Sequence, residues 1–428
     1  GEFYLSPREF SIDVIRRLRE QGFTAFWAGG CVRDLLLGRP ATDFDVATNA
    51  TPAEVRQVFG SRKTLAVGES FGVMIVLGPK SAGQVEVATF RLDGTYADGR
   101  RPDHVEFCDA EHDAQRRDFT INGMFYDPLS ETVHDFVGGQ ADLQRRVVRA
   151  IGNPIERMTE DKLRMLRAIR FAAVLDFELD SETANAVQHM ARQLVVVSSE
   201  RIAQELQKCL RHANRSIALE MLRSLDLLPM ILPEVVETVV HFSEERWNQL
   251  LHSLKHVSEL SFEAAMSMVL RFVPAPADWR KHDAPGHGTV QDICRRLRLS
   301  NDQLAHICWL VQNRNAFDSA STLPLAQLKR QLVSPYVDDL LTIERAWTIC
   351  QGDATNEFDW VENYRSVTPT SQINPPELLT GRDLIQLGHQ PGPHFSEWLT
   401  TIRDAQLNEQ IKHRDEALKL LEQLATNL

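Results

Sequence analysis

The segment FTAFWAGGCVRDLLLGRPATDFDVAT, residues 23–48, decides how the rest of the chain is interpreted. Its first six residues are apolar, aromatic or threonine, which predicts a buried strand. A glycine pair, Gly29 and Gly30, follows, and three consecutive leucines then favour a helix. Glycines between a strand and a helix let backbone amides approach an anion, and the helix dipole favours negative charge there. With Arg33 at the same turn, the pattern predicts a phosphate site, although a glycine pair also serves as a plain tight turn.

The end of this segment carries two carboxylates at alternate positions, Asp43 and Asp45. In a strand, Phe44 and Val46 face the core and both aspartates face the other side, about 7 Å apart. Two such carboxylates repel each other unless a cation lies between them. Hard oxygen ligands beside a phosphate site point to Mg²⁺. An exposed edge strand that carries Asp-x-Asp without a metal is the alternative.

Two further strands are predicted at residues 71–77 and 85–90, joined by a turn-rich segment. Glu86 is the lone acid in the second of them. It either lies on the exposed face or joins the two aspartates as a third carboxylate. The polar segment 93–103, which is punctuated by glycine and proline, predicts a loop.

Residues 116–126 begin charged and become apolar, which predicts a helix whose polar face carries Arg117, Asp118 and Asn122. Arginine binds phosphate oxygens, whereas aspartate and asparagine bond hydroxyl groups. These three side chains therefore suit the triphosphate and the ribose of a nucleotide. The α/β part is expected to close near residue 148.

The segment EDKLRMLRAIR, residues 160–170, predicts a single helix because its leucines and isoleucine recur at helical spacing. Asp161 and Arg164 then lie on one stripe, an acceptor of hydrogen bonds beside a donor. This pair matches a base edge that offers an amino group next to a ring nitrogen, as adenine and cytosine do and guanine and uracil do not. An ordinary ion pair on a solvated helix face is the alternative.

The composition describes an ordinary water-soluble protein of two to four domains: 428 residues, 43% hydrophobic and 25% charged. No apolar run is long enough to span a membrane and no leader is apparent, so a cytoplasmic location is expected. Six scattered cysteines without a Cys-x-x-Cys favour reduced thiols. The net charge of −12 argues against general affinity for nucleic acid, but residues 143–170 hold eight Lys/Arg against three acids. That local excess either guides a phosphate backbone or forms a solvated helix face.

Taken together, these blocks resemble the class II tRNA nucleotidyltransferases, which are the CCA-adding enzymes, and their relatives the bacterial poly(A) polymerases. The resemblance extends over roughly residues 20–210, and a further block at 379–393 is similar to the tail of long CCA-type members. The motifs occur in the family's order and at similar spacing: Gly29-Gly30-x-Val32-Arg33-Asp34, Asp43-x-Asp45, Arg116-Arg117-Asp118-Phe119-Thr120-x-Asn122, Asp135-x-x-Gly138-Gly139-x-x-Asp142-Leu143, Glu160-Asp161-x-x-Arg164-x-x-Arg167 and Ser199-x-Arg201-Ile202.

The resemblance implies an α+β fold, with an N-terminal nucleotidyltransferase head built on a small mixed β-sheet and an all-α neck, body and tail after it. The expected domains are a catalytic head at 1–148, a helical neck with the base-reading helix at 149–212, a body at 213–300 and an RNA-binding tail at 301–428. The oligomeric state is left open.

The resemblance also implies roles for the candidate residues. Asp43 and Asp45 hold Mg²⁺ in a two-metal mechanism, with Glu86 as a less certain third catalytic carboxylate. Nucleotide binding is shared among ten residues: Gly29, Gly30, Arg33, Arg117, Asp118, Asn122, Asp161, Arg164, Arg167 and Arg170. Within that set, the glycines, Arg33 and Arg117 take the triphosphate, and Asp118 and Asn122 take the ribose. Asp161 and Arg164 read the base, while Arg167 and Arg170 support them or contact phosphates.

The expected activity is template-independent addition of CCA to the 3′ end of tRNA from CTP and ATP. Addition of the terminal A alone and poly(A) synthesis are the alternatives within the family. The loop at 93–103 is similar to that of members that add the final A, which makes a CC-only enzyme less favoured. A non-catalytic RNA-binding scaffold is the alternative of another class.

Overall fold

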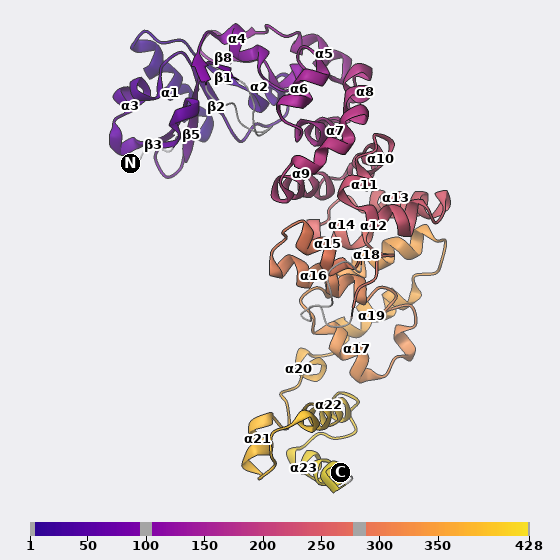
Figure 1. Cartoon of the computed structure of the whole chain (residues 1–428). Coiled ribbons are helices and arrows are strands. Elements are labelled where there is room, and N and C mark those ends of the chain that lie inside the picture. Colours follow the sequence, from indigo (N-terminus) through magenta and orange to yellow (C-terminus); the bar gives the residue numbers. More distant parts are fainter. Residues whose placement is uncertain (1–4, 95–104, 277–287, 427–428) are drawn as a thin grey trace. The chain divides into compact units, whose positions relative to one another are not determined.

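The structure is a computed structural model that describes residues 5–94, 105–276 and 288–426 (Figure 1). Most of the loop expected at 93–103 lies outside these ranges. The chain divides into two compact units between Val236 and Glu237. The expected division into head, neck, body and tail is finer than this and stays a prediction.

The first unit contains the small mixed sheet that the sequence predicts, with seven strands. Its strand β2 runs parallel to β5, and every other neighbouring pair is antiparallel. The strands in their order across the sheet are β3 (Thr64–Gly68), β4 (Val73–Leu77), β5 (Gln84–Thr89), β2 (Asp45–Thr48), β1 (Ala25–Ala28), β8 (Phe125–Asp127) and β9 (Thr132–His134).

Helix α1 (Pro7–Glu20) packs on this sheet through an apolar stripe that includes Val14, Ile15 and Leu18, all fully buried. It begins at a capping box in which Ser6 and Glu9 satisfy each other's backbone amides. Trp27 of β1 is fully buried beneath it, and its indole nitrogen donates to the Ser11 hydroxyl at 2.9 Å. The core between α1 and the sheet therefore includes β1, the first strand of the 23–48 segment.

The helix predicted over residues 116–126 is wrong. Helix α4 (Ala110–Gln115) ends before it, a short 3₁₀ turn η3 spans Thr120–Asn122, and β8 follows. The reason is burial, because every residue from 119 to 125 is buried and an amphipathic helix would expose one face.

The single helix predicted over residues 160–170 is also wrong, because it is interrupted at Asp161. Helix α6 (Pro154–Glu160) ends there, and α7 (Arg164–Leu175) begins three residues later. Asp161 has an extended backbone, with φ −146° and ψ 107°. Its carboxylate accepts the Leu163 amide at 3.1 Å, the kind of local bond that competes with helix continuation. Asp161 and Arg164 therefore do not share a helical stripe.

The rest of the described chain is helical, as the sequence predicts, apart from two short strand pairs, β6 (Arg91–Asp93) with β7 (Val105–Phe107) and β10 (Val147–Val148) with β11 (Glu178–Leu179). The remaining helices of the first unit are α2 (Gly30–Leu36), α3 (Pro52–Phe59), α5 (Gly139–Arg145), α8 (Ser181–Met190), α9 (Ser199–Arg211), α10 (Arg215–Ser224), α11 (Leu228–Ile231) and α12 (Pro233–Val235).

The second unit is all-α in its described residues. Near its end, Trp398, Ile402 and Leu421 share one buried cluster. Its helices are α13 (Glu244–His256), α14 (Phe262–Val269), α15 (Val290–Arg296), α16 (Asn301–Gln312), α17 (Leu325–Leu332), α18 (Val337–Cys350), α19 (Asn356–Val367), α20 (Thr370–Ile373), α21 (Gly381–Gln386), α22 (Pro393–Leu407) and α23 (Arg414–Thr426).

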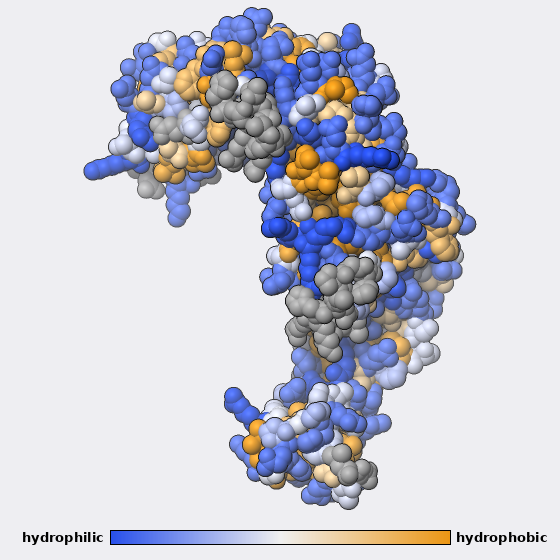
Figure 2. Space-filling model, in the orientation of Figure 1, coloured by the Kyte–Doolittle hydropathy of each residue, from blue (hydrophilic) through white to orange (hydrophobic). Residues whose placement is uncertain are grey.

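The face shown in Figure 2 is largely hydrophilic, with apolar side chains in scattered groups. All six cysteines are free thiols, as predicted. None of the helices in the described part of the chain has the length and apolar character needed to cross a membrane.

Candidate nucleotide-binding site

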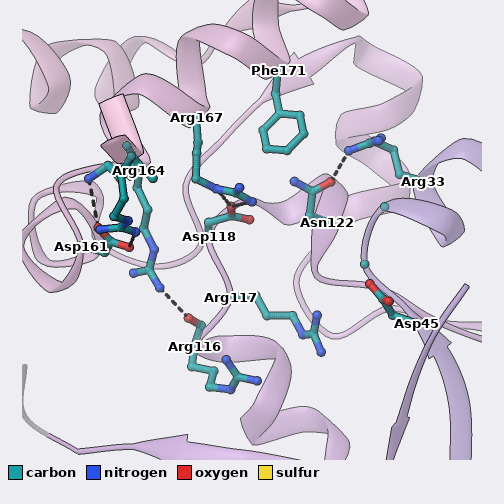
Figure 3. Close-up of a pocket in the computed structure, with 14 residues that line it drawn as sticks. Arg33, Asp45, Arg116, Arg117, Asp118, Asn122, Asp161, Arg164, Arg167 and Phe171 are labelled. Atoms are coloured by element: carbon teal, nitrogen blue, oxygen red, sulfur yellow. Dashed lines mark hydrogen bonds and ion pairs between the residues drawn. The ribbon is translucent and has the colours of Figure 1, made fainter. Parts of the chain in front are cut away.

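One cavity of about 500 Å³ in the first unit brings together most of the predicted site residues (Figure 3). Six arginines and three aspartates line it, which gives it an excess of positive charge. The lining residues are Gly29, Gly30, Arg33, Asp45, Arg116, Arg117, Asp118, Asn122, Asp161, Leu163, Arg164, Arg167, Phe171 and Arg201. Three predicted residues, Asp43, Glu86 and Arg170, are not among them.

The glycine turn lies between β1 and α2. Gly29 has φ +75°, a backbone conformation that residues other than glycine rarely adopt. Arg33, in α2, donates to the Asn122 side-chain oxygen at 2.7 Å. The Asn122 backbone N–H donates to the Phe119 carbonyl at 3.0 Å, whereas its side-chain nitrogen Nδ2 makes no hydrogen bond to the residues that the structure describes and can donate to a ligand.

A buried aspartate in α4, Asp113, holds the arginines at 116 and 117. Its Oδ1 accepts from Arg116 Nε at 3.0 Å, and its Oδ2 accepts from Arg117 Nε and Nη2 at 3.1 and 3.0 Å. The side chain of Asp113 is 1% exposed. Burial raises its pKa, but the two guanidinium charges outweigh burial and the pKa lies below its usual value. The ionised Asp113 carboxylate thus holds the guanidinium groups of Arg116 and Arg117, which both line the cavity.

Asp118 and Arg167 form a second ion pair on the cavity wall. The Asp118 Oδ2 accepts from Arg167 Nε at 2.9 Å and lies 2.7 Å from Nη2. Burial raises the pKa of Asp118, but the charge and hydrogen bond of Arg167 outweigh it, so the net shift is downward. Arg170 lies behind this wall and pairs with the buried Glu205 at 2.5 Å.

The two residues predicted to read the base both line the cavity, but each contacts a different partner (Figure 3). Asp161 faces Arg201 in α9, with Nη1–Oδ1 and Nη2–Oδ2 distances of 3.1 and 2.7 Å. Arg164 donates to Glu160 at 2.5 Å and to the backbone carbonyls of Arg157 and Arg116 at 3.0 and 3.4 Å. The simple ion pair between Asp161 and Arg164, which was the alternative, is therefore absent from this part of the structure.

The carboxylates Asp45 and Glu86 lie side by side because β2 pairs in parallel with β5 and Val46 is in register with Val87. Both line a second, smaller cavity that adjoins Arg116 and Arg117. Burial, followed by the negative charge of Glu86, raises the pKa of Asp45 to about 6; Arg117 opposes this shift and Asp43 adds to it. Glu86 is exposed, as the first alternative has it, and lies next to Asp45; its role as a third carboxylate stays a prediction.

The donor set fits a magnesium ion that is completed by its substrate. Within residues 5–94, 105–276 and 288–426, no three His, Cys, Asp or Glu side chains are arranged as a ready metal site. Mg²⁺ commonly takes one or two protein carboxylates, with water and substrate phosphate oxygens as its other ligands. The pKa of Asp45 is raised first by burial and then by the charges of Glu86 and Asp43, and a bound cation would offset both effects.

Four residues that line the cavity are not among the predicted site residues: Arg116, Leu163, Phe171 and Arg201. Two of them stand inside the motifs quoted above, Arg116 in the Arg-Arg-Asp block and Arg201 in the Ser199-x-Arg201 block. Phe171 carries no polar group, and its ring lies under the guanidinium groups of Arg33, Arg167 and Arg170 at 5.2, 5.2 and 4.2 Å.

Two family descriptions match the chain, within the first unit apart from the last two residues of the second match. Residues 25–149 match the Poly A polymerase head domain, and residues 176–238 match the probable RNA and SrmB-binding site of polymerase A. The first match contains the sheet from β1 onward, Asp45 and the Arg-Arg-Asp block.

Relatives of known name match nearly the whole chain. The CCA-adding enzyme of Lactococcus lactis subsp. lactis is 37% identical over 96% of this chain and 96% of that protein. The CCA-adding enzyme of Pediococcus pentosaceus is 30% identical over 96% of this chain and 97% of that protein.

Solved structures share the fold. The Bacillus stearothermophilus CCA-adding enzyme in complex with CTP aligns with a TM-score of 0.76, 26% identity and coverage of 98% of both chains. The Thermotoga maritima CCA-adding enzyme complexed with tRNA_CCA aligns with a TM-score of 0.63 at 21% identity, over 99% of this chain and 97% of that one.

Proposed function

This chain belongs to the family of CCA-adding enzymes, and from that premise we propose that its arginine-lined cavity binds CTP or ATP for transfer to the 3′ end of tRNA. The chain is a template-independent tRNA nucleotidyltransferase, and its substrates are tRNA, CTP and ATP. We place the reaction in the cytoplasm, as expected from the sequence.

One observation carries the assignment of the cavity: Asp161 and Arg164 line the same space as Arg33 and Arg117. A carboxylate that only accepts and a guanidinium that only donates thus face a chamber that also offers phosphate-binding charge. A nucleoside triphosphate needs all of these contacts at once.

The base-reading pair keeps enough bonding capacity for a nucleobase. A carboxylate has about four acceptor positions, and Asp161 uses three of them, two on Arg201 and one on the Leu163 amide. One remains to accept the exocyclic amino group of cytosine or adenine. Arg164 has five N–H donors, of which three are engaged, and another can donate to the adjacent ring nitrogen.

The remaining lining residues bind the phosphates and the ribose. Arg33 and Arg117 bind the triphosphate beside the glycine turn, and the free Asn122 amide donates to a ribose hydroxyl. Asp118 accepts a hydroxyl hydrogen and is held in place by Arg167. Arg170 acts from behind, where it keeps Glu205 and Phe171 packed under this wall.

Asp45 and Asp43 would hold Mg²⁺, with Glu86 next to Asp45. When bound, the metal supplies Lewis acidity to the 3′-hydroxyl of the tRNA and to the departing pyrophosphate. The residues of this chain orient the triphosphate, exclude wrong bases and place the reacting phosphate next to Asp45.

The test is extension of a tRNA that lacks its terminal CCA, with products sized after incubation with CTP, ATP or both. CTP with ATP should complete CCA and then stop, and EDTA should abolish the reaction. Growth with ATP alone beyond one residue would instead favour poly(A) synthesis, and extension only of tRNA ending in CC would favour terminal A addition. A folded wild-type chain that extends no primer would favour an RNA-binding scaffold.

A further inference from the structure

Arg157 lies outside the nucleotide cavity, and its side chain bonds its own helix α6, the segment before α6 and the end of α4. Its side chain, on α6, is 12% exposed. Its guanidinium donates to the carbonyl of Ile151 at 3.1 Å, to the Glu160 carboxylate at 2.8 Å and to the carbonyl of Gln115 at 2.8 Å. At this exposure water cannot reach all five of its N–H groups. The three bonds to the protein therefore fix the position of the guanidinium.

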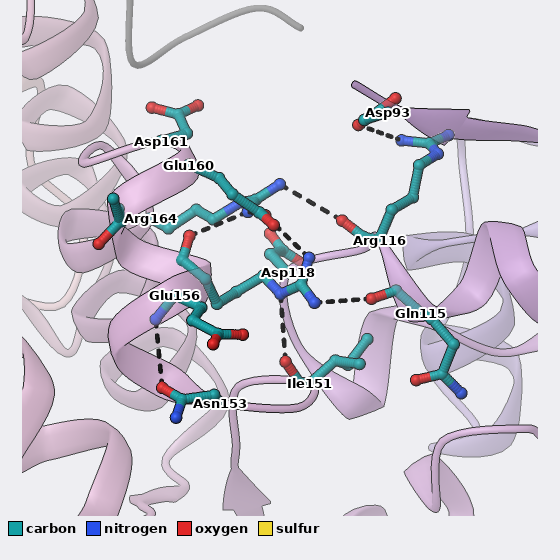
Figure 4. Close-up of polar contacts among 12 residues, drawn as sticks. Asp93, Gln115, Arg116, Asp118, Ile151, Asn153, Glu156, Glu160, Asp161 and Arg164 are labelled. Carbon is teal, nitrogen blue, oxygen red and sulfur yellow. Dashed lines mark hydrogen bonds and ion pairs between the residues drawn. The ribbon is translucent and has the colours of Figure 1, made fainter. Parts of the chain in front are cut away.

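Arg164 shares the same surroundings (Figure 4). Its Nη1 donates to the same Glu160 Oε2 and to the backbone carbonyl of Arg157, and its Nη2 reaches the carbonyl of Arg116. Arg157 thus supports Arg164 in two ways, through its own carbonyl and through the carboxylate that both guanidinium groups use.

The two arginines also bond consecutive carbonyls, those of Gln115 and Arg116, at the end of α4. The last carbonyls of a helix lack intrahelical partners and accept such donors readily. The same helix carries Asp113, which holds Arg116 and Arg117. The peptide at 115–117 therefore connects the base-reading Arg164 to Arg117, which is assigned to the triphosphate.

We propose that Arg157 is a positioning residue that fixes Arg164 relative to the triphosphate arginines, and that it thereby sets how strongly the enzyme rejects UTP and GTP. This inference rests on the proposed role of Arg164 in reading the base. Arg157 touches no nucleotide in this assignment and acts only through the bonds above.

Loss of the Arg157 side chain leaves Glu160 with one partner and the Gln115 carbonyl with none among the described contacts. Arg164 keeps its bonds to Glu160 and to the carbonyl of residue 157, but Glu160 is then held by Arg164 alone, and α6 loses the side-chain bond that ties it to the end of α4. A displacement of about 1 Å matters for a hydrogen-bonded base edge, whereas a triphosphate is bound by several charges at once. Selectivity should therefore fall more than nucleotide binding does.

The experiment compares Arg157→Met with Arg149→Met as the matched control. Arg149 is also a paired arginine of the first unit, bonded to Asp142 at 3.1 Å and Asp180 at 2.8 Å, and it does not contact Arg164. We would measure kcat/KM for all four nucleotides on tRNA acceptors, together with the thermal unfolding midpoint. In the Arg157 variant the CTP:UTP and ATP:GTP ratios should fall roughly tenfold, and in the control they should stay at wild-type values.

The CTP:UTP and ATP:GTP ratios of Arg157→Lys should lie between those of the wild type and those of Arg157→Met. Lysine keeps a charge for Glu160 but cannot reach both carbonyls. If the methionine variant does not fold, this variant decides: a reduced ratio supports the inference, and a wild-type ratio overturns it. An equal loss of kcat/KM for all four nucleotides in Arg157→Met would also overturn it, because it would mean a purely structural role.

Arg164→Met separates this inference from the proposed function. If that variant keeps wild-type selectivity, the assignment of Arg164 to the base is wrong. If it loses selectivity while Arg157→Met does not, only the inference about Arg157 fails. The double variant should show no further loss of selectivity than Arg164→Met alone.

Discussion

Asp161 and Arg201 face each other through two parallel N–H to oxygen contacts, at 3.1 and 2.7 Å, across 40 residues of sequence. Their side chains are only 15% and 19% exposed. Paired contacts of this kind fix orientation as well as position. Helix α9 therefore sets the direction in which the Asp161 carboxylate meets a base.

Asp161→Ala should relax base selection. Without the carboxylate, the amino group of cytosine or adenine loses its acceptor, which costs about 1–3 kcal/mol. The ratio of kcat/KM for CTP over UTP should fall roughly tenfold to a hundredfold. Single-nucleotide incorporation assays check this, with Arg201→Met expected to cause a smaller loss in the same direction. Equal losses for all four nucleotides in the Asp161 variant would remove this residue from its proposed role.

Arg117→Ala should have the opposite pattern. Removing a guanidinium from the triphosphate costs about 1.5–3 kcal/mol for a hydrogen bond to a charged group. KM should rise roughly tenfold or more for CTP and ATP alike, while the CTP:UTP ratio is kept. Steady-state kinetics with each nucleotide would reveal it, and a change in selectivity without a change in KM would contradict the assignment.

Asp113→Asn should mimic the Arg117 variant without touching the nucleotide. It leaves two guanidinium groups without their buried anion, so the protein should lose about 3 kcal/mol of stability. KM for CTP and ATP should rise together, and adding Arg117→Ala should increase it by less than the two single effects combined. Asp176→Asn is the control, because that carboxylate is 71% exposed and lies 3.7 Å from Arg146. Full additivity of Asp113 and Arg117 would show that the two act independently.

Asp45 should make stability depend on pH when no metal is added. Its pKa rises from 3.8 to about 6 on folding, so the folded protein binds the proton more tightly than the unfolded chain does. The contribution is fully present below pH 4 and is lost as pH rises to about 6. Asp45→Asn should remove this fall in the unfolding free energy between those values, as measured by urea unfolding at several pH values.

Mg²⁺ should bind this site better at pH 7.5 than at pH 5, because the proton and the metal compete for Asp45. Thermal unfolding with and without Mg²⁺ would show a larger upward shift at the higher pH. The same shift in Asp45→Asn would place the ion elsewhere.

The sequence predicts the sheet well where burial is strong. Trp27 and its neighbours in β1 are apolar on both faces, and the paired strands β4 and β5 alternate clearly. The edge strand β3 was not predicted: its apolar run is only three residues long, and both Leu65 and Val67 are exposed. The prediction of a helix at 116–126 was wrong because residues 119–125 are buried on all sides. Tertiary burial there overrides the local preference for a helix with one exposed face.

For the site, residue types and motif order located ten of the fourteen residues that line the cavity. Their partners could not be predicted, because they are distant in sequence: Asn122 for Arg33, and Arg201 for Asp161. The interruption at Asp161 has a similar cause. Local spacing favours one continuous helix, whereas a contact with a residue 40 positions later favours the extended backbone.

The contacts that Gln115 and Arg116 make to the arginines of α6 and α7 use their main-chain oxygens alone. Any amino acid supplies such an oxygen, so evolution can exchange the side chain at 115 without disturbing the partner arginine. What these two contacts require is a path of the backbone and not a residue type. Engineering that aims at new nucleotide preferences would therefore gain from varying the length and turn geometry of 115–118, and not only the identities of the residues that face the base.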